Sequence, residues 1–301
     1  MSAEAAHHPL ERREIPALPR PCWRSALHGE VDGRKVFGSI AQSGWRGLCL
    51  NELPLHRPWS QLGSFRISPG DWANAWPGIV AGLERDWQRI KSDGSGLVAR
   101  GVIDVGGRVI RVVAKQPYRQ RASHALIDIV RGSRARRAWK RTWELLVRGL
   151  PTEVPLLVME KRSGPLIIDN LALFEFVPGQ TIFHSNLAGY SETARSQLFR
   201  SVGAILRDLE RHGFSHRDAK TTNWIIFSEG LGELCPVMLD CYGVRRWGVA
   251  GAGLDRFLRA LARHPQFRAQ DATCVCNGYA PGGWPETVRR THTQYTMAAK
   301  T

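Results

Sequence analysis

Apolar and polar residues alternate most clearly between residues 93 and 178. Asp93 to Gly96 is a short glycine-rich turn, Leu97 to Val105 predicts a strand, and Arg108 to Lys115 predicts the return strand after the two-residue turn Gly106-Gly107. Two later apolar runs, PLLVMEKR and LIIDNLALFEFVPG, predict a second pair of strands joined by a turn at residues 163–165. This part of the chain therefore predicts an antiparallel sheet.

A helix is predicted between these two pairs of strands, in the segment SRARRAWKRTWELLVRGL, and Gly149 ends it. At about 100° per residue, one side of this helix is apolar. The apolar side carries Trp139, Trp143, Leu146 and Leu150. The opposite side carries Arg137, Lys140, Arg141, Glu144 and Arg148.

Helical periodicity returns in the C-terminal third. Ser191 to His212 predicts a helix capped by Ser191, with Gly213 after its end. Its apolar face consists of Leu198, Val202, Ile205, Leu206 and Leu209. Two short strands, NWIIF and CPVMLD, follow, and a further helix is predicted around Leu254 to Ala262. From about Ala280 the pattern is weak.

The first 90 residues give weaker signals. Residues 1–20 are predicted to be disordered. The segment PGDWANAWPGIVAGLERDWQRI predicts a helix that Asp71 could cap and that Pro77 interrupts or restarts. We therefore expect an α+β chain in three parts: a partly disordered N-terminal extension (1–90), an antiparallel-sheet part (91–178) and a mainly helical part with a short tail (179–301).

The positive charge of the chain is concentrated in one segment. The net charge is +15, and Arg108 to Arg148 contains twelve Lys or Arg against two acids, a net +10. Such a cluster favours an anionic partner: phosphate groups, acidic lipid or nucleic acid. The preference for Arg, 35 of 42 basic residues, could reflect codon usage, but codon usage does not explain the clustering.

Other features of the sequence indicate a cytoplasmic protein. No apolar run approaches about 18 residues, the length that favours a membrane-spanning helix. The N-terminal segment MSAEAAHHPLERREIPALPR contains acids and has no apolar stretch typical of a signal peptide. Six cysteines are scattered, and Cys274-Val-Cys276 without a second pair is a poor zinc signal, so we expect reduced, buried thiols.

The segment GFSHRDAKTTNWIIF carries the clearest chemical signal. Asp218 and Asn223 lie five positions apart between a predicted helix and a predicted strand, and Asp240 ends the next strand. Phosphoryl transfer needs a carboxylate to orient the attacking hydroxyl and oxygen ligands for Mg²⁺. Asp218 is the candidate base, and Asn223 and Asp240 are the candidate metal ligands. Taken singly, each could be a turn former or a strand cap.

Three further positions fit the same chemistry. The turn Gly94-Ser95-Gly96 could hold phosphates with its backbone N–H groups, and Lys115 on the following strand could pair with them. Lys220 could offset charge on the transferred phosphoryl group. The complete order of turn, lysine, helices, His-Arg-Asp-x-x-x-x-Asn, hairpin and Asp-x-x-Gly favours a kinase over an accidental arrangement.

This order resembles the protein-kinase-like fold. More narrowly, SRARRAWKRTWELLVRGLPTEVPLLVMEKR together with FSHRDAKTTNW is similar to the lipopolysaccharide core (heptose/Kdo) kinase family, over roughly Asp93 to Leu261. The resemblance implies an ATP- and Mg²⁺-dependent enzyme with two lobes, acting at the inner face of a bacterial cytoplasmic membrane on the lipopolysaccharide core. By the same resemblance, the backbone around Glu175 to Val177 would hold adenine.

One departure concerns the partner of Lys115. Kinases of this type usually carry a helix glutamate there, and the aligned residue is Ala138, while Glu144 lies among basic residues on the other side of the helix. Three interpretations stay open. An acid from elsewhere, with Glu160 as a candidate, replaces it; the enzyme works without the pair; or the chain is a pseudokinase that binds without turnover. Asp-Cys-Tyr-Gly also departs from Asp-Phe-Gly, but it keeps the aspartate and the glycine.

The acceptor is expected to be small or lipid-linked. Only 58 residues follow Gly243, and there is no Ala-Pro-Glu motif. The basic segment suits a lipid-linked glycan or another anionic acceptor on an anionic membrane surface. The alternatives are a protein Ser/Thr side chain or a soluble metabolite as acceptor. Nucleic acid is the least favoured partner.

Overall fold

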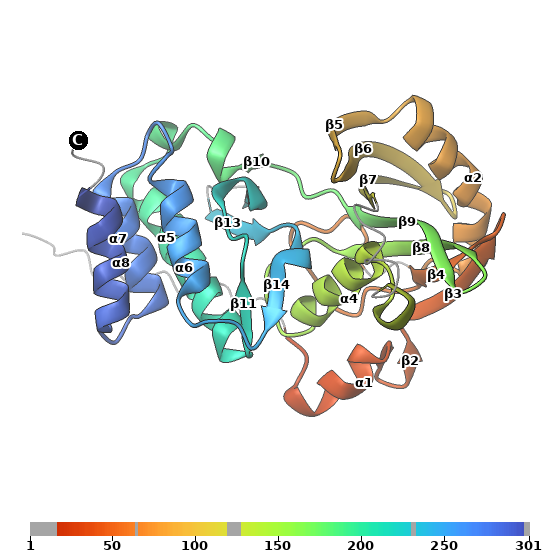
Figure 1. Ribbon diagram of the computed structural model, residues 1–301, viewed down its shortest axis with the longest axis horizontal. Coiled ribbons are helices and arrows are strands. Elements are labelled where there is room, and N and C mark those ends of the chain that lie inside the picture. Colours follow the sequence, from red (N-terminus) through yellow and green to blue (C-terminus); the bar gives the residue numbers. More distant parts are fainter. Residues whose placement is uncertain (1–16, 64–65, 119–127, 230–232, 298–301) are drawn as a thin grey trace, which may run out of the picture.

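The computed structural model describes residues 17–63, 66–118, 128–229 and 233–297. It is a mixed α+β structure, with a large antiparallel sheet at one end and a group of helices at the other (Figure 1). Two separate groups of buried apolar side chains accompany these two ends. We call them the sheet core and the helical core.

The main sheet has seven strands in the order β3-β4-β8-β9-β7-β6-β5, and every neighbouring pair is antiparallel. The strands are β3 (Phe37–Gln42), β4 (Trp45–Leu50), β5 (Gln88–Asp93), β6 (Gly96–Val105), β7 (Arg108–Pro117), β8 (Pro155–Ser163) and β9 (Leu166–Glu175). The two predicted pairs, β6 with β7 and β8 with β9, are confirmed. Gly106 and Gly107 have φ angles of 61° and 76°, the left-handed conformation that a tight two-residue hairpin turn requires.

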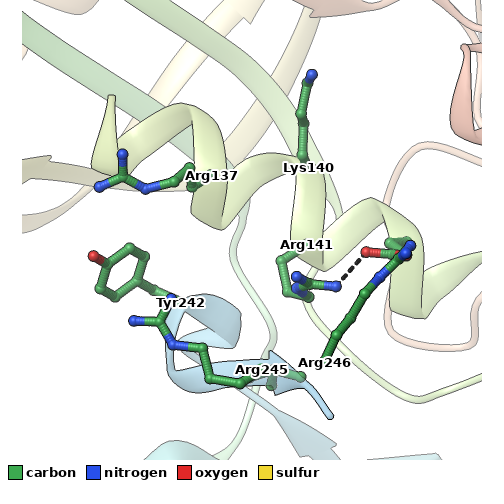
Figure 2. A pocket seen from close by; sticks show the side chains of 8 residues that line it. Arg137, Lys140, Arg141, Tyr242, Arg245 and Arg246 are labelled. Atoms are coloured by element: carbon green, nitrogen blue, oxygen red, sulfur yellow. Dashed lines mark hydrogen bonds and ion pairs between the residues drawn. The ribbon is translucent and has the colours of Figure 1, made fainter. Parts of the chain in front are cut away.

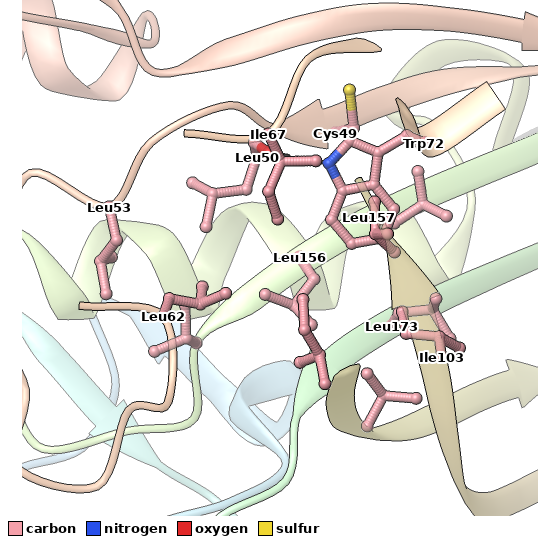
Figure 3. Packing of buried hydrophobic residues seen from close by; sticks show 14 of the residues in the cluster. Cys49, Leu50, Leu53, Leu62, Ile67, Trp72, Ile103, Leu156, Leu157 and Leu173 are labelled. Carbon is pink, nitrogen blue, oxygen red and sulfur yellow. Dashed lines mark hydrogen bonds between the residues drawn. The ribbon is translucent and has the colours of Figure 1, made fainter. Parts of the chain in front are cut away.

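Both edges of the sheet come from residues that the sequence did not assign to strands. β3 and β4 pair onto β8, and β5 pairs onto β6. The prediction that a helix continues to Ile90 is therefore wrong. All six residues of β5 are exposed, so this edge strand lacks the apolar alternation that reveals a half-buried strand. The sheet core packs side chains of β4, β8 and β9 with Trp72 (Figure 3).

Helix α2 (Pro69–Arg85) packs on β6 and β3. Its N-cap is Ser68, whose hydroxyl accepts from the Asp71 N–H at 3.1 Å, while the Asp71 carboxylate accepts from the Ser68 N–H at 2.9 Å. Asp71 is therefore the third helical residue of a capping box and not the cap itself. Pro77 lies inside the helix, which neither ends nor restarts there, so that expectation is wrong.

Helix α4 (Arg134–Leu146) lies on β8 and β9 and contacts the 3₁₀ turn η5 (Cys241–Gly243). Ser133 caps it by accepting from the Arg136 N–H at 3.1 Å. The predicted apolar side is confirmed, since its members are all buried: Trp139, Trp143, Leu146 and Leu150. The charged side is left facing η5 and the strand after it.

The helical core is built around α5 (Glu192–Arg211), which Ser191 caps and whose predicted apolar face is buried. The other helices are α6 (Ala252–Leu261), α7 (Ala269–Tyr279) and α8 (Glu286–Met297). Both α7 and α8 were missed in the sequence. The cysteines of Cys274-Val-Cys276 are buried on α7 as free thiols. No described helix combines the length and the apolar character needed to cross a membrane.

Small strand pairs lie beside these helices. β10 (Gln180–Thr181), β12 (Trp224–Glu229) and β13 (Glu233–Met238) form a three-stranded sheet, and β11 (Phe214–His216) pairs with β14 (Val244–Arg246). The predicted strands NWIIF and CPVMLD correspond to β12 and β13. Near the N-terminus are η1 (Arg20–Cys22), α1 (Trp23–Leu27), β1 (Glu30–Val31) and β2 (Arg34–Lys35). Residues 1–16 lie outside the described residues, and their disorder stays a prediction.

Segment 57–62 connects the two cores. The Trp59 indole N–H donates to the Thr152 carbonyl at 3.1 Å, and an Arg57 Nη donates to the Leu146 carbonyl at 2.6 Å. The Trp59 ring packs in a small cluster with Val177 and with side chains of β12 and β13. A parallel bridge between Thr152 and Met238 adds a second backbone link.

Candidate functional site

The loop between β11 and β12 brings Asp218 and Asn223 together. The 3₁₀ turn η4 (Thr221–Asn223) returns the chain so that Asn223 Nδ2 donates to the Asp218 carbonyl at 2.8 Å and to Asp218 Oδ2 at 3.2 Å. These bonds leave the Asn223 amide oxygen without a hydrogen-bond partner among the described residues. The two residues that lie five positions apart in the sequence are therefore hydrogen-bonded to each other in the structure.

Asp218 is held as a carboxylate by its surroundings. Lys220 Nζ lies 3.1 Å from Oδ2, and Arg256 Nη2 of α6 donates to Oδ1 at 3.4 Å. Burial raises the pKa of Asp218, but Lys220, Asn223 and Arg256 outweigh it and hold the pKa below its usual value. Asp218 is therefore an ionised hydrogen-bond acceptor at neutral pH.

His216 supports this loop from beneath. It is buried, and its Nδ1 accepts from the Asp218 N–H at 3.2 Å. Burial is the main reason that the pKa of His216 falls to about 4, so the ring is neutral at physiological pH. A neutral imidazole with Nδ1 as acceptor fixes the backbone of Asp218 without adding charge beside it.

Asp240 follows β13 and has a φ angle of 53°, an uncommon conformation for a residue with a side chain. Its carboxylate is exposed and has no hydrogen-bond or ion-pair partner among the described residues. The backbone next to Asp240 is joined to the Asp218 loop, because the Leu239 N–H donates to the Asn223 carbonyl at 2.8 Å. A carboxylate and an amide oxygen left free in this way are ligands that Mg²⁺ accepts.

Lys115 on β7 has a partner that the sequence did not reveal. Its Nζ lies 2.5 Å from Glu153 Oε1, and the same oxygen accepts from the Asp240 N–H at 3.2 Å. The Glu153 side chain is only 3% exposed, and the Lys115 side chain 20%. Burial lowers the pKa of Lys115, but the charges of Glu153 and Asp240 raise it overall, so the ammonium persists.

Glu160 is not the partner of Lys115. It accepts from the Ser133 N–H at 2.9 Å and pairs with Arg162 at 2.9 Å and with Arg136 at 3.6 Å. Glu160 therefore stabilises the start of α4. Ala138 lies on α4 beside Trp139 and offers no charge, so the open question about the acid is answered by Glu153 from the segment between α4 and β8.

The turn Gly94-Ser95-Gly96 joins β5 and β6 at the Lys115 end of the sheet, since Gly96 is opposite Pro117 and Val98 is opposite Lys115. Asp93 Oδ1 accepts from the Ser95 N–H at 2.8 Å and from its hydroxyl at 2.5 Å. A Cβ at Gly96 would lie 2.7 Å from the Gln116 carbonyl oxygen, so this position needs glycine. The Ser95 N–H is thus already bound within the turn.

Glu175 and Val177 lie where β9 leads toward the helical core, and both side chains are almost inaccessible. The Glu175 carboxylate accepts from the Ser60 hydroxyl at 2.6 Å and from the Gln61 N–H. Its burial raises the pKa of Glu175 to about 7. These contacts tie the predicted adenine segment to residues 60–61, a connection that no sequence pattern indicated.

Two residues of the site were missed in the sequence, Glu153 and Arg256. Glu153 lies 38 positions from Lys115, and Arg256 lies 38 positions from Asp218, so neither contact has a local signal. Among the described residues, no group of three or more His, Cys, Asp or Glu side chains is placed so that it could hold a metal ion. No protein-family model matches the chain, and no curated protein matches it.

Proposed function

We propose that this chain is an ATP- and Mg²⁺-dependent kinase with a two-lobed protein-kinase-like fold. It transfers a phosphoryl group to a hydroxyl on a sugar of the lipopolysaccharide core or a similar lipid-linked glycan, at the cytoplasmic face of a membrane. The single observation that carries the proposal is the connected set Lys115, Glu153, Asp240, Asn223 and Asp218, which links the sheet to the catalytic loop.

The chemical order of this set supports the proposal. Glu153 fixes the Lys115 ammonium and, through the same oxygen, the backbone of Asp240. Asp240 and Asn223 would hold Mg²⁺, while Lys115 and Lys220 would meet negative charge on phosphate. When bound, MgATP would supply the γ-phosphoryl group, which would be transferred to the acceptor hydroxyl while ADP leaves.

Asp218 would act on the acceptor. Its ionised carboxylate can accept a hydrogen bond from the attacking hydroxyl and take its proton. Lys220 pairs with Asp218 Oδ2 and Arg256 with Oδ1, while Asn223 donates a hydrogen bond to Oδ2 and so orients the carboxylate. The reaction then depends mainly on positioning and charge, as phosphoryl transfer generally does.

The arrangement of the two cores supports the fold proposal. The strand order β5-β6-β7-β9-β8 puts the lysine strand β7 inside the sheet and directs β9 toward the helical core. The pseudokinase alternative was based on Ala138, and Glu153 weakens it because the charge pair is supplied from another segment.

The proposal is tested by incubating purified protein with γ-labelled ATP, Mg²⁺ and a total envelope-lipid extract, beside Asp218→Ala. We expect label in the glycolipid fraction with the wild-type protein and none with the variant. Asp104→Ala, which removes the same charge from an exposed position on β6 close to the Gly106-Gly107 turn, is the matched control and should label normally.

Separate outcomes distinguish the alternatives. Label in protein or in a soluble metabolite would replace the lipid-linked acceptor but keep the kinase. ATP binding without any transfer would support the pseudokinase. If ATP with Mg²⁺ neither transfers phosphate nor raises the melting temperature, the kinase proposal is wrong, because a ligand that binds the native state must stabilise it.

A further inference from the structure

A basic pocket of about 300 Å³ lies between α4 and β14. It borders the Asp218 loop, because Val244 is paired with His216 and the Arg217 N–H donates to the Gly243 carbonyl at 3.1 Å. Figure 2 shows Arg137 and Arg141 on α4 facing the segment that carries Tyr242, Arg245 and Arg246. We define the basic pocket by Arg137, Lys140, Arg141, Tyr242, Arg245 and Arg246. None of these six residues forms a hydrogen bond or an ion pair with Lys115, Asp218, Asn223 or Asp240, although Tyr242 lies two positions after Asp240.

The pocket has more positive charge than it can neutralise. Its lining includes five basic side chains and one acid, Glu144, a net charge of +4. Glu144 is already bound by Arg141 and Arg246, and by Arg148 at 3.5 Å. Arg137 is paired with Asp128 at 2.9 Å. Lys140 and Arg245 form no ion pair or hydrogen bond with any residue in the described ranges.

The aromatic ring of Tyr242 organises the cations. The guanidinium groups of Arg134, Arg245 and Arg137 lie 5.0, 5.3 and 5.9 Å from its centroid. Such contacts hold several like charges close together without neutralising them. Burial and then Arg136 lower the pKa of Lys140. An anion entering the pocket would relieve this repulsion.

The chain leaves the pocket through an exposed apolar segment. Trp247 follows Arg246 directly and is 90% exposed, and Val249 is 76% exposed. The backbone of Trp247 is anchored, since its N–H donates to the Gly213 carbonyl at 3.0 Å. Its φ angle is 58°, which is an outlier for a bulky residue. A fixed, strained backbone that presents a tryptophan to solvent suggests a binding role for the ring.

We propose that the basic pocket and the segment Trp247–Val249 dock this protein on an anionic lipid bilayer, with a lipid phosphate group in the pocket and the Trp247 ring at the interface. Tryptophan is favoured at the level of the headgroups, and arginine grips phosphate with two parallel N–H donors. The proposal deepens the proposed function, because it names the surface that would reach a lipid-linked acceptor. Because it concerns membrane binding and not phosphoryl transfer, it can be wrong while the proposed kinase function is right, and the reverse also holds.

The apolar part of this surface favours lipid over nucleic acid. An exposed indole could stack on a base, but the exposed aliphatic Val249 beside it has no comparable partner in a polynucleotide. A bilayer interface accepts both side chains while its phosphates meet the five cations. The positive charge and the exposed apolar side chains together therefore fit an anionic lipid bilayer better than a nucleic acid.

The experiment is cosedimentation of the full chain with vesicles, without ATP. One set is phosphatidylcholine, and the other is equal parts phosphatidylcholine and phosphatidylglycerol. The variants are Lys140→Ser with Arg245→Ser, and Trp247→Asn, since asparagine tolerates a positive φ. The control, Arg289→Ser with Arg290→Ser, removes the same charge from exposed positions on α8, which packs on α6 and α7.

We expect binding to the anionic vesicles only. Removing two cations should weaken binding about 25-fold, since each basic residue near an anionic surface contributes about 1 kcal/mol, or about fivefold. Trp247→Asn should weaken it several-fold and remove part of the fluorescence quenching by lipids brominated near the headgroup. The control should change binding far less than the pocket variant, and all variants should keep the wild-type melting temperature.

Several results would overturn the proposal. Equal losses in the pocket variant and the α8 control would mean that net charge alone drives binding. Equal binding to the phosphatidylcholine vesicles, whose lipids carry a phosphate but no net charge, would contradict docking on an anionic surface. If inorganic pyrophosphate occupies the pocket and vesicles do not compete for it, the ligand is a soluble phosphate. If a short RNA binds more tightly than the anionic vesicles through the same residues, the surface serves nucleic acid.

Discussion

Glu153 holds two parts of the candidate site with one carboxylate oxygen, which meets Lys115 Nζ and the Asp240 N–H. We expect Glu153→Gln to keep the shape of this contact while removing the charge that fixes Lys115. Affinity for ATP should fall about tenfold, or about 1.4 kcal/mol, within the range of a charge-assisted hydrogen bond. Calorimetric titration with MgATP measures it.

Glu160→Gln is the matched control for this prediction. It makes the same chemical change in another carboxylate of low exposure, one whose partners are Ser133, Arg136 and Arg162. It should lower the stability of the fold through the start of α4 and leave ATP affinity unchanged. Similar losses of ATP affinity in both variants would show that Glu153 has no special link to the nucleotide.

A second prediction at this scale concerns Glu175, whose pKa is raised by burial from 4.5 to about 7. A carboxyl with a raised pKa binds its proton more tightly in the folded state, so its contribution is complete below pH 4.5 and is lost as pH rises through 7. Glutamine does not titrate, so as pH rises from 4.5 to 7 the free energy of unfolding of Glu175→Gln should increase by about 3 kcal/mol relative to that of the wild type. Denaturant unfolding at a series of pH values measures this difference.

The comparison with the variant is necessary because His216 acts in the opposite direction. Its pKa is lowered from 6.5 to about 4, so the folded state loses stability as pH falls through that range. The two groups partly offset each other in the wild-type profile. A difference between Glu175→Gln and wild type that stays constant with pH would contradict the raised pKa of Glu175.

The residues of the candidate site were predictable to the extent that their partners are local. Asp218 and Asn223 lie in one loop, and a spacing of five was enough to bring them together. Glu153, the partner of Lys115, lies in the segment that connects α4 to β8, and its position depends on how this segment runs past β7. The sequence indicated only that the usual helix glutamate was missing. Arg256 likewise reaches Asp218 from α6, and the sequence pattern of this helix did not indicate which of its sides faces Asp218.

At the scale of elements, α5 and α7 pack so closely that glycine is required on both. A Cβ at Gly203 would lie 2.0 Å from the Val275 carbonyl oxygen, and one at Gly278 would lie 1.9 Å from the Arg200 carbonyl oxygen. We expect Gly203→Ala to destabilise the protein by about 2 kcal/mol or more, since two backbones must separate. Thermal unfolding followed by circular dichroism measures it.

The matched control is Gly78→Ala in α2, where a Cβ would meet nothing within 4 Å. Alanine is the better helix former by about 1 kcal/mol, so this variant should be slightly stabilised. The same substitution is thus expected to have opposite signs on two helices. If Gly203→Ala is neutral or stabilising, the close approach of α5 and α7 is not present in solution.

The elements that the sequence predicted are those with a wide apolar face. The hairpins β6–β7 and β8–β9 and the helices α4 and α5 bury large side chains at regular spacing. By contrast, β5 is exposed along its whole length, and α7 buries the small residues Ala272, Cys274 and Cys276. Such elements are fixed by their neighbours, and a single-sequence pattern carries little trace of them.

At the scale of the whole molecule, the two cores are separate clusters, and Trp59 belongs to a third, smaller cluster. Its ring lies against Val177, Ile225 and Phe227, and its N–H is bound by Thr152. Contacts of this kind decide whether two parts of one chain unfold together or separately.

We therefore expect Trp59→Ala to cost about 3–5 kcal/mol and to split unfolding into two transitions. Trp72→Ala removes an equally buried indole, hydrogen-bonded to the Leu50 carbonyl at 2.9 Å, but from within the sheet core. It should lower stability without separating the cores. Far-ultraviolet circular dichroism and tryptophan fluorescence should disagree along the denaturant axis for the first variant and coincide for the second. If both variants unfold in one transition, Trp59 is not the residue that couples the two cores.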